Sequence, residues 1–164
     1  MENIPPSAVK KLLLELQDLH KRPLEGLTLA PSSSSSLTSL RATLLGRSGT
    51  PYASGTFHLR ITFPPDFPSA APAAFFDTKI FHPNVDPATG AVCVSTLKRE
   101  WDAGVDLRKV FMVIQCLLVD PNPESALNEE AGKLLLEDYE EFEKRARLMT
   151  EIYAQGEGGA SAGE

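Results

Sequence analysis

Four prolines stand within ten residues in the segment FPPDFPSAAP, residues 63–72. Proline has no backbone N–H to donate and its ring fixes φ, so this segment cannot form a regular helix or a central strand of a sheet. We expect it to be irregular and packed, and to lead into a short strand over AAFF, residues 73–76. The fold must therefore accommodate a long proline-rich connection between elements.

Three further short strands are predicted before this connection. TFHLRITF, residues 56–63, alternates partly between apolar and polar residues, as a strand does. It follows GRSGTPYASG, residues 46–55, whose glycine and proline density is typical of a hairpin connection. Residues 27–29 and 37–45 are predicted as strands on either side of a serine-rich loop. Four consecutive short strands favour an antiparallel meander sheet.

Two helices are indicated by apolar residues at helical spacing. The N-terminal helix is predicted to begin near Pro6 and to end before Pro23. Its apolar stripe consists of Val9, Leu12, Leu13, Leu16 and Leu19. A central apolar helix is predicted to begin at Leu107 and to end before the breaker DPNPES, residues 120–125.

The last part of the chain, residues 126–154, is helix-forming throughout, with Gly132 and the region of Asp138 as candidate interruptions. We therefore predict two C-terminal helices. The order of elements favours an α+β fold in which the antiparallel sheet packs on the central helix. The length suits one domain, expected over residues 1–154, and residues 155–164 have nothing to bury and are expected to be a disordered tail.

Composition and charge argue against several classes of function. No apolar run approaches the ~18 residues that suggest a membrane span, so no membrane partner is expected. The net charge is −6, because residues 124–164 hold 4 basic and 11 acidic side chains while residues 1–123 are nearly balanced. An acidic chain without a basic stripe is a poor binder of nucleic acid. Two cysteines and no secretion-type leader favour a reducing compartment, the cytoplasm or the nucleus.

The two cysteines stand in different surroundings. Cys93 follows the polar turn of HPNVDPATGAVC, so we expect it to be exposed and treat it as the candidate nucleophile. Cys116 lies in the apolar run FMVIQCLLV, where burial as a small hydrophobe is expected. The sequence thus predicts one reactive thiol and one structural thiol.

A histidine-assisted hydrolase is disfavoured by the positions of the three histidines. His20 closes the first helix, His58 lies in the third strand, and His82 precedes a proline, where we expect its ring to hold the local backbone. A cysteine hydrolase needs a histidine to deprotonate its thiol and a third group to orient that histidine. None of the three has such a motif context.

Thiol exchange with an incoming thioester needs no such base. An unshifted thiol, with a pKa near 8.5, is a few per cent thiolate at neutral pH, which is enough to attack an activated acyl group. The later attack of an amine on the new thioester produces an oxyanion, which the uncharged amide of Asn84 could stabilise. The pair Asn84 and Cys93 therefore fits acyl transfer to an amine.

Five motifs, taken together, resemble the ubiquitin-conjugating enzyme family over residues 5–154. They are GTPY at 49–52, HPN at 82–84, Cys93 after the Gly90 turn, Trp101, and DPNP at 120–123. The stretch NPESALNEEAGKLLLEDYEEFEKRARLMTEIYA is similar to the S-type branch of that family, which elongates ubiquitin chains with the anaphase-promoting complex.

The resemblance implies an α+β ubiquitin-conjugating fold and a reaction. Cys93 would accept ubiquitin from the activating enzyme as a thioester and pass it to a lysine, extending polyubiquitin chains with a RING-type ligase. Asn84 would stabilise the oxyanion or organise the active-site loop, and His82 would be architectural.

Three further positions near the cysteine carry implied roles. Leu127 matches an apolar gate position. Glu129 matches a glutamate that orients the acceptor lysine, with a surface glutamate of a helix as the alternative. Ser125 stands where many members have an acidic residue near the incoming lysine.

Partner contacts are implied at four positions. Lys10 and Lys11 match the region that the family offers to the activating enzyme, with a solvated helix face as the alternative. Phe63 and Ala103 match two loops that contact RING-type ligases, although many RING-responsive members carry proline at the Ala103 position. No metal and no cofactor are expected, because ATP is used upstream by the activating enzyme.

Two features depart from the family pattern. The interval from Asn84 to Cys93 is one residue longer than usual, and we expect the turn containing Pro87 and Gly90 to absorb it. The Lys-rich C-terminal docking extension of the S-type branch has no counterpart in this sequence. Two alternatives remain open at this point: a non-catalytic scaffold of the same fold, or conjugation of another ubiquitin-like modifier.

Overall fold

A computed structural model describes residues 4–30, 39–93, 97 and 101–156. The four strands form one antiparallel sheet in the order β1-β2-β3-β4, which confirms the predicted meander. Their bounds are Leu27–Leu29 for β1, Ser39–Leu45 for β2, Thr56–Thr62 for β3 and Ala73–Phe76 for β4. The expected start of the second strand at residues 37–38 lies outside the described residues.

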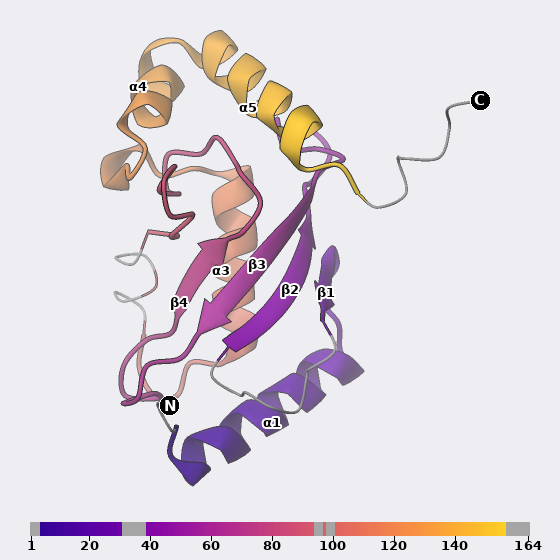
Figure 1. Cartoon of the computed structure of the whole chain (residues 1–164), viewed down its shortest axis with the longest axis vertical. Coiled ribbons are helices and arrows are strands. Elements are labelled where there is room, and N and C mark those ends of the chain that lie inside the picture. Colours follow the sequence, from indigo (N-terminus) through magenta and orange to yellow (C-terminus); the bar gives the residue numbers. More distant parts are fainter. Residues whose placement is uncertain (1–3, 31–38, 94–96, 98–100, 157–164) are drawn as a thin grey trace, which may run out of the picture.

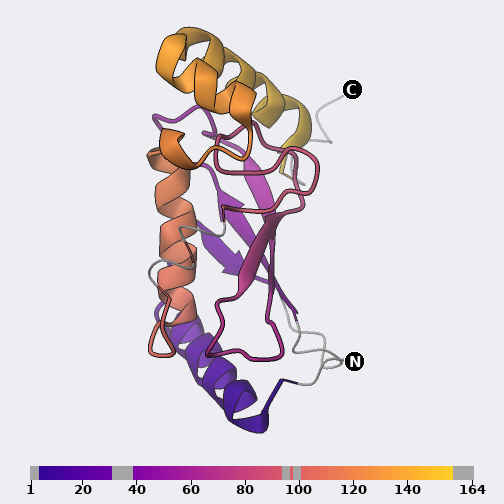
Figure 2. The same ribbon diagram turned by 90° about the vertical axis from the view of Figure 1, so that its left-hand side faces the viewer.

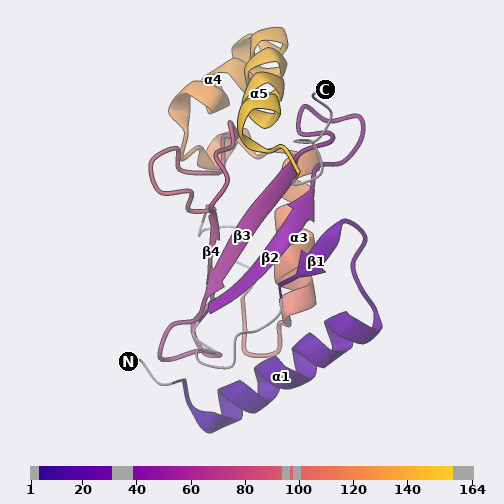
Figure 3. The same cartoon turned by 45° about the vertical axis from the view of Figure 1, so that its right-hand side comes forward.

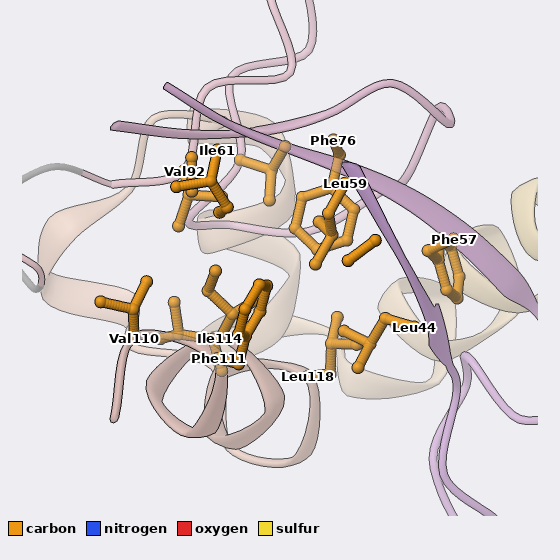
Figure 4. Close-up of a cluster of buried hydrophobic side chains, with 14 of the residues drawn as sticks. Leu44, Phe57, Leu59, Ile61, Phe76, Val92, Val110, Phe111, Ile114 and Leu118 are labelled. Carbon is orange, nitrogen blue, oxygen red and sulfur yellow. The ribbon is translucent and has the colours of Figure 1, made fainter. Parts of the chain in front are cut away.

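The core lies between the inner face of the sheet and helix α3, Leu107–Val119 (Figure 4). Buried and less buried residues alternate along β2, β3 and β4, as expected for strands with one covered face. Phe57, Leu59 and Ile61 from β3 face Phe111 and Ile114 from α3 in this core. Figure 2 shows α3 standing against one face of the sheet. The predicted packing of the sheet on the central helix is therefore confirmed.

The other helices lie at the two ends of this layer pair (Figure 1). Helix α1, Pro6–Lys21, crosses one end, as Figure 3 shows from another side. Helices α4, Glu129–Glu137, and α5, Tyr139–Tyr153, cover the opposite end. The helices α1 and α3 contact each other, and α4 contacts both α5 and a 3₁₀ turn, η1, Pro123–Ser125. Both C-terminal helices were predicted.

Two details of the helices differ from the sequence prediction. Leu13 was assigned to the buried stripe of α1 but is 47% exposed, because Ala8, Leu12 and Leu19 make the inward face. Gly132 does not interrupt α4 and lies buried within it, so the break between the last two helices falls at Asp138 alone. Asp138 ends α4 and accepts from the N–H of Glu141 to begin α5.

The proline-rich connection after β3 is irregular, as predicted, and its Phe67 is buried in the core. No helix among the described residues is long and apolar enough to cross a membrane. Most of the predicted C-terminal tail, residues 157–164, lies outside the described residues.

Candidate active site

A short hairpin brings Asn84 and Cys93 side by side. Val85 and Val92 form an antiparallel bridge, and the backbone N–H of Cys93 donates to the carbonyl oxygen of Asn84 over 2.8 Å. The two chain segments are therefore in register at the point where the candidate nucleophile stands. The geometry joins the two residues that the sequence paired.

The turn of this hairpin is held by a carboxylate and closed by a glycine. The Asp86 carboxylate accepts from the backbone N–H groups of Ala88, at 2.8 Å, and Thr89, at 3.2 Å. Gly90 closes the turn with a φ of 78°, and a Cβ there would lie 2.1 Å from the carbonyl oxygen of Phe76. Glycine is therefore required by both the backbone conformation and the close approach.

The ring of His82 is fully buried and ties two backbone segments together. Its Nδ1 accepts from the N–H of Asn84 at 3.0 Å, so the ring proton is on Nε2, which donates to the carbonyl oxygen of Leu117 at 2.6 Å. Burial lowers the pKa of His82 to about 4, and the hydrogen bond to Leu117 opposes this only in part. Both nitrogens are engaged in backbone contacts, so His82 is not placed to act as a base.

Tyr52 supports the same segment, and the sequence analysis gave it no role. Its hydroxyl donates to the carbonyl oxygen of Phe81 over 2.7 Å, and its ring centroid lies 5.6 Å from that of His82. Burial raises the pKa of Tyr52, which keeps the phenol neutral. The only sequence signal for this contact was the GTPY motif.

The side-chain amide of Asn84 is fully buried and holds the loop before α4. Its Nδ2 donates to the carbonyl oxygens of Asn122, at 2.8 Å, and Ser125, at 3.1 Å. Its Oδ1 accepts from the N–H of Asn122 at 2.8 Å. Both hydrogens on Nδ2 are therefore used within the protein, which is the geometry of a loop organiser. Service as an oxyanion donor would require the amide to leave these partners.

The HPN segment also fixes the residues that lead into α4. The carbonyl oxygen of Pro83 accepts from the backbone N–H groups of Leu127, at 2.8 Å, and Asn128, at 3.0 Å. Leu127 is 42% exposed beside this contact. Asn128 caps α4 by accepting from Ala131, and Glu129 follows as the exposed first residue of the helix. Ser125 thus contacts Asn84, Leu127 contacts Pro83, and Glu129 follows directly after the residue that caps α4.

The exposure of the two cysteines is the reverse of the prediction. Cys93 is only 5% exposed, because Val92 and Cys93 pair inward against the Asn84 segment. Cys116 is exposed, because α3 turns Ile114, Leu117 and its other inward residues toward the sheet and leaves position 116 on the outer side. The apolar sequence around Cys116 did not distinguish the two faces of the helix.

Phe63 is also misplaced in the prediction. It is 5% exposed and packs against Phe67, with ring centroids 4.9 Å apart, so it is not available for contact with a ligase. The exposed residues of that connection include Asp66 and Ser69. The local pattern of aromatics and prolines did not show which aromatic side chain points inward.

Lys10, Lys11 and Ala103 lie at the other end of α3 from the hairpin. Lys11 contacts the carbonyl oxygen of Val105 just before α3 begins, whereas His82 contacts Leu117 near its end. Ten residues of helix separate Leu107 from Leu117, which is a rise of about 15 Å. The predicted residues therefore form two groups, one around Cys93 and one around the start of α3. Lys10 and Ala103 are exposed there.

The described residues contain no group of three or more histidine, cysteine, aspartate or glutamate side chains arranged to hold a metal ion.

The chain belongs to the ubiquitin-conjugating enzyme family, whose sequence profile matches residues 11–150. This confirms the resemblance seen in the motifs and makes the protein a ubiquitin transferase by class. It is similar to ubiquitin-conjugating enzyme E2 S of Xenopus tropicalis, with 49% identity over 95% of this chain and 73% of that protein. The similarity to E2 S of Bos taurus is also 49%, over 99% of this chain and 72% of that protein.

Solved structures agree with this assignment. The E2 domain of a ubiquitin conjugating enzyme of Toxoplasma gondii superposes with a TM-score of 0.79 at 35% identity, covering 90% of this chain and 99% of that one.

Protonation of His82 should destabilise the fold in acid. Because the folded pKa of about 4 lies below the ordinary value of 6.5, the unfolded chain binds the proton more readily between these values. The contribution to the free energy of unfolding is complete above pH 6.5 and falls by up to about 3 kcal/mol as pH drops towards 4. Urea unfolding from pH 7.5 to 4 measures it. His82→Asn should flatten that part of the profile, and the exposed His58→Gln should not.

The two thiols should differ in reactivity in the free protein. Iodoacetamide should modify the exposed Cys116 first and Cys93 about tenfold more slowly, because alkylation requires an accessible thiolate. Peptide mass spectrometry after timed quenching measures both rates, and the two should converge in urea. A Cys116→Ser variant gives the Cys93 rate alone. Equal rates in the folded protein would contradict the buried position of Cys93.

Proposed function

We propose that this chain accepts ubiquitin as a thioester on Cys93 and transfers it to a lysine, extending polyubiquitin chains together with a RING-type ligase. The observation that carries the proposal is the 2.8 Å hydrogen bond from the Cys93 N–H to the Asn84 carbonyl oxygen. It holds the thiol on the hairpin whose Asn84 amide binds the loop of residues 122–125. The nucleophile Cys93, the amide of Asn84 and residues 122–128, which we call the acceptor side because the acceptor lysine is proposed to approach there, are thereby parts of one hydrogen-bonded unit.

The first step is an exchange between two thiols. The Cys93 thiolate attacks the carbonyl carbon of the thioester that joins ubiquitin to the activating enzyme. A new C–S bond to Cys93 forms, and the cysteine thiolate of the activating enzyme leaves. His82 takes no part as a base, because both ring nitrogens serve the backbone. The reaction draws instead on the few per cent of thiolate present at neutral pH and on the activated ester of the partner.

The burial of Cys93 adds a requirement to this step. With 5% of the residue exposed, the thiol must be uncovered before a partner's thioester can reach it. We infer that contact with the activating enzyme supplies this opening, since a partner that binds the open form better shifts the population towards it.

The second step is attack by a lysine amine on the thioester carbon. A C–N bond forms, the Cys93 thiolate leaves, and the amine proton passes to water or to a nearby carboxylate. Leu127 and Glu129 stand on the segment that Pro83 and Asn84 hold in place, so an acceptor approaching there meets an apolar gate and then a carboxylate. Glu129 is suited to attract and orient the ammonium of the acceptor before it loses its proton.

Asn84 acts in this step as the organiser of the acceptor side. Its three hydrogen bonds to Asn122 and Ser125 support that role directly. A neutral Ser125 does not supply the charge that an acidic residue would provide there, and Glu129 is the carboxylate that the family resemblance assigns to the acceptor lysine.

The proposed partners follow from the similarity to ubiquitin-conjugating enzymes and from the residues around the start of α3. The activating enzyme would use the exposed Lys10, and a RING-type ligase would use Ala103 and the exposed part of the proline-rich connection. We propose chain elongation with the anaphase-promoting complex as the specific setting, which the S-type resemblance of residues 122–154 implies. We propose action in the cytoplasm and nucleus with no cofactor bound by this chain, ATP being consumed by the activating enzyme.

A charging assay with activating enzyme, ATP and ubiquitin tests the central role of Cys93. The wild type should form an adduct that dithiothreitol removes, and Cys93→Ser should form a more stable oxyester. Asn84→Ala should charge nearly normally and discharge to lysine more slowly, because loss of three buried hydrogen bonds loosens the acceptor side. Cys116→Ser is the control and should match the wild type in both steps.

Two results would contradict this assignment. Absence of any reducible adduct in the wild type would leave the non-catalytic scaffold, and an adduct with a different modifier alone would change the substrate. Equal slowing of charging and discharge by Asn84→Ala would show that Asn84 serves the whole hairpin and not the acceptor side.

Glu129→Ala should slow chain building more than discharge to free lysine. A carboxylate that orients a protein-borne lysine matters less when the amine is small and present in excess. Gel-based chain assays and single-turnover discharge to free lysine give the two rates, with a loss of about tenfold expected in the first alone. Glu140→Ala, another exposed glutamate in the first turn of a helix, is the matched control. An equal loss in both assays rules out the orienting role.

A further inference from the structure

Helix α1 is tied to the start of α3 by a network of two side chains. Glu15 forms an ion pair with Lys11 one turn earlier on α1, and its Oε2 accepts from the backbone N–H of Leu107 at 3.1 Å. The ammonium of Lys11 also donates to the carbonyl oxygen of Val105 at 3.1 Å. The side chains of Lys11 and Glu15 are 23% and 15% exposed, so the network is largely shielded from water.

Glu15 supplies a helix cap from a different element. The first N–H groups of a helix have no partner within it. In α3, Asp106 accepts from the N–H of Lys109, and Glu15 of α1 accepts from the N–H of Leu107. A carboxylate at this end of the helix is further favoured by the helix dipole. The position of α3 relative to α1 is therefore set by a charged hydrogen bond as well as by apolar packing.

The same network holds the loop that carries Ala103. Within the loop, the Asp102 carboxylate accepts from the N–H of Gly104 at 2.7 Å, and the N–H of Val105 donates to the Asp102 carbonyl oxygen at 3.0 Å. One side of this tight turn is anchored by Trp101, whose Nε1 donates to the carbonyl oxygen of Pro68 at 2.9 Å. The other side is anchored at residues 105 and 107 by α1.

We propose that Lys11 and Glu15 are positioning residues that fix the loop of residues 101–106 against α1, so that the surface made by Lys10 and this loop serves the ubiquitin-activating enzyme during charging, in addition to the RING-type ligase proposed above to use Ala103. The proposal rests on the proposed function in its choice of partner. It also revises the role expected for Lys11, whose ammonium is committed to Glu15 and Val105 and is not a free contact. Lys10, the neighbouring residue on α1, is exposed.

A direct contact of Lys11 with the partner and a positioning role predict different combined effects when Lys11 and Glu15 are both changed. If Lys11 touched the partner itself, removal of Glu15 would leave that contact in place, and the effects of changing both residues would add. If the two residues act through the loop, either change releases the same structure, and the double variant is no worse than the more severe single variant.

The kinetic test measures initial charging rates against the concentration of this chain, with activating enzyme and ubiquitin held constant. Lys11→Met and Glu15→Ala should each raise KM by about threefold to tenfold with kcat little changed, and the double variant should show no further increase. Glu15→Gln, which can still accept from Leu107, should recover part of the loss. Lys10→Met should raise KM independently, so that its effect adds to that of Lys11→Met.

A second measurement does not depend on charging. Amide hydrogen exchange followed by nuclear magnetic resonance should show the Leu107 N–H exchanging about tenfold faster in Glu15→Ala, with shifted resonances at residues 102–105 and unchanged exchange at Ile114 in the middle of α3. Unchanged exchange at Leu107, an unchanged KM in Glu15→Ala, or additive effects of Lys11→Met and Glu15→Ala would each overturn the proposal. A wild type that fails to charge would refute the proposed function, while the exchange experiment would still decide whether Glu15 holds the loop.

Discussion

The ring of His82, held between the N–H of Asn84 and the carbonyl oxygen of Leu117, is the interaction on which the arrangement of the site depends. It connects the hairpin that bears Cys93 to the last turn of α3, the helix that forms one half of the core. Because the ring is neutral and fully buried, both hydrogen bonds lie in a medium where leaving them unmade is costly. Tyr52 packs against the ring and adds a third attachment through Phe81.

From this attachment the HPN segment holds residues 122–128, the segment proposed to face the acceptor lysine. Pro83 and Asn84 together make five hydrogen bonds to residues 122–128, two through a carbonyl oxygen and three through a side-chain amide. Attack of an amine on a thioester is favoured by such fixed surroundings, because holding the two reacting groups in the right geometry lowers the entropic part of the barrier. The residues proposed to contact partners lie at the other end of α3, about 15 Å along the helix from the hairpin that bears Cys93.

The sequence predicted the helices, the strands and the pairing of Asn84 with Cys93 better than it predicted which side chains are exposed to solvent. The four strands, the three helical regions and the pairing of Asn84 with Cys93 follow from short-range patterns, namely proline and glycine positions, apolar spacing and a known motif. The exposure predicted for Cys93 and Cys116 was wrong, and Phe63, which was expected to contact a ligase, is buried, because the local sequence pattern does not show which of these side chains points inward. Tyr52 was missed for the same reason, since its partners are 29 and 30 positions away.

By itself the sequence determined that this chain forms an α+β domain with a glycine-closed hairpin carrying an asparagine and a cysteine, because local backbone chemistry and apolar periodicity are written in neighbouring residues. Only the tertiary structure decided that the Asn84 amide is committed to Asn122 and Ser125, that the Cys93 thiol is covered, and that the Lys11 ammonium donates to the carbonyl oxygen of Val105. Those outcomes depend on which distant groups meet in the folded chain, and hydrogen-bond partners across 38 or 94 positions leave no local trace.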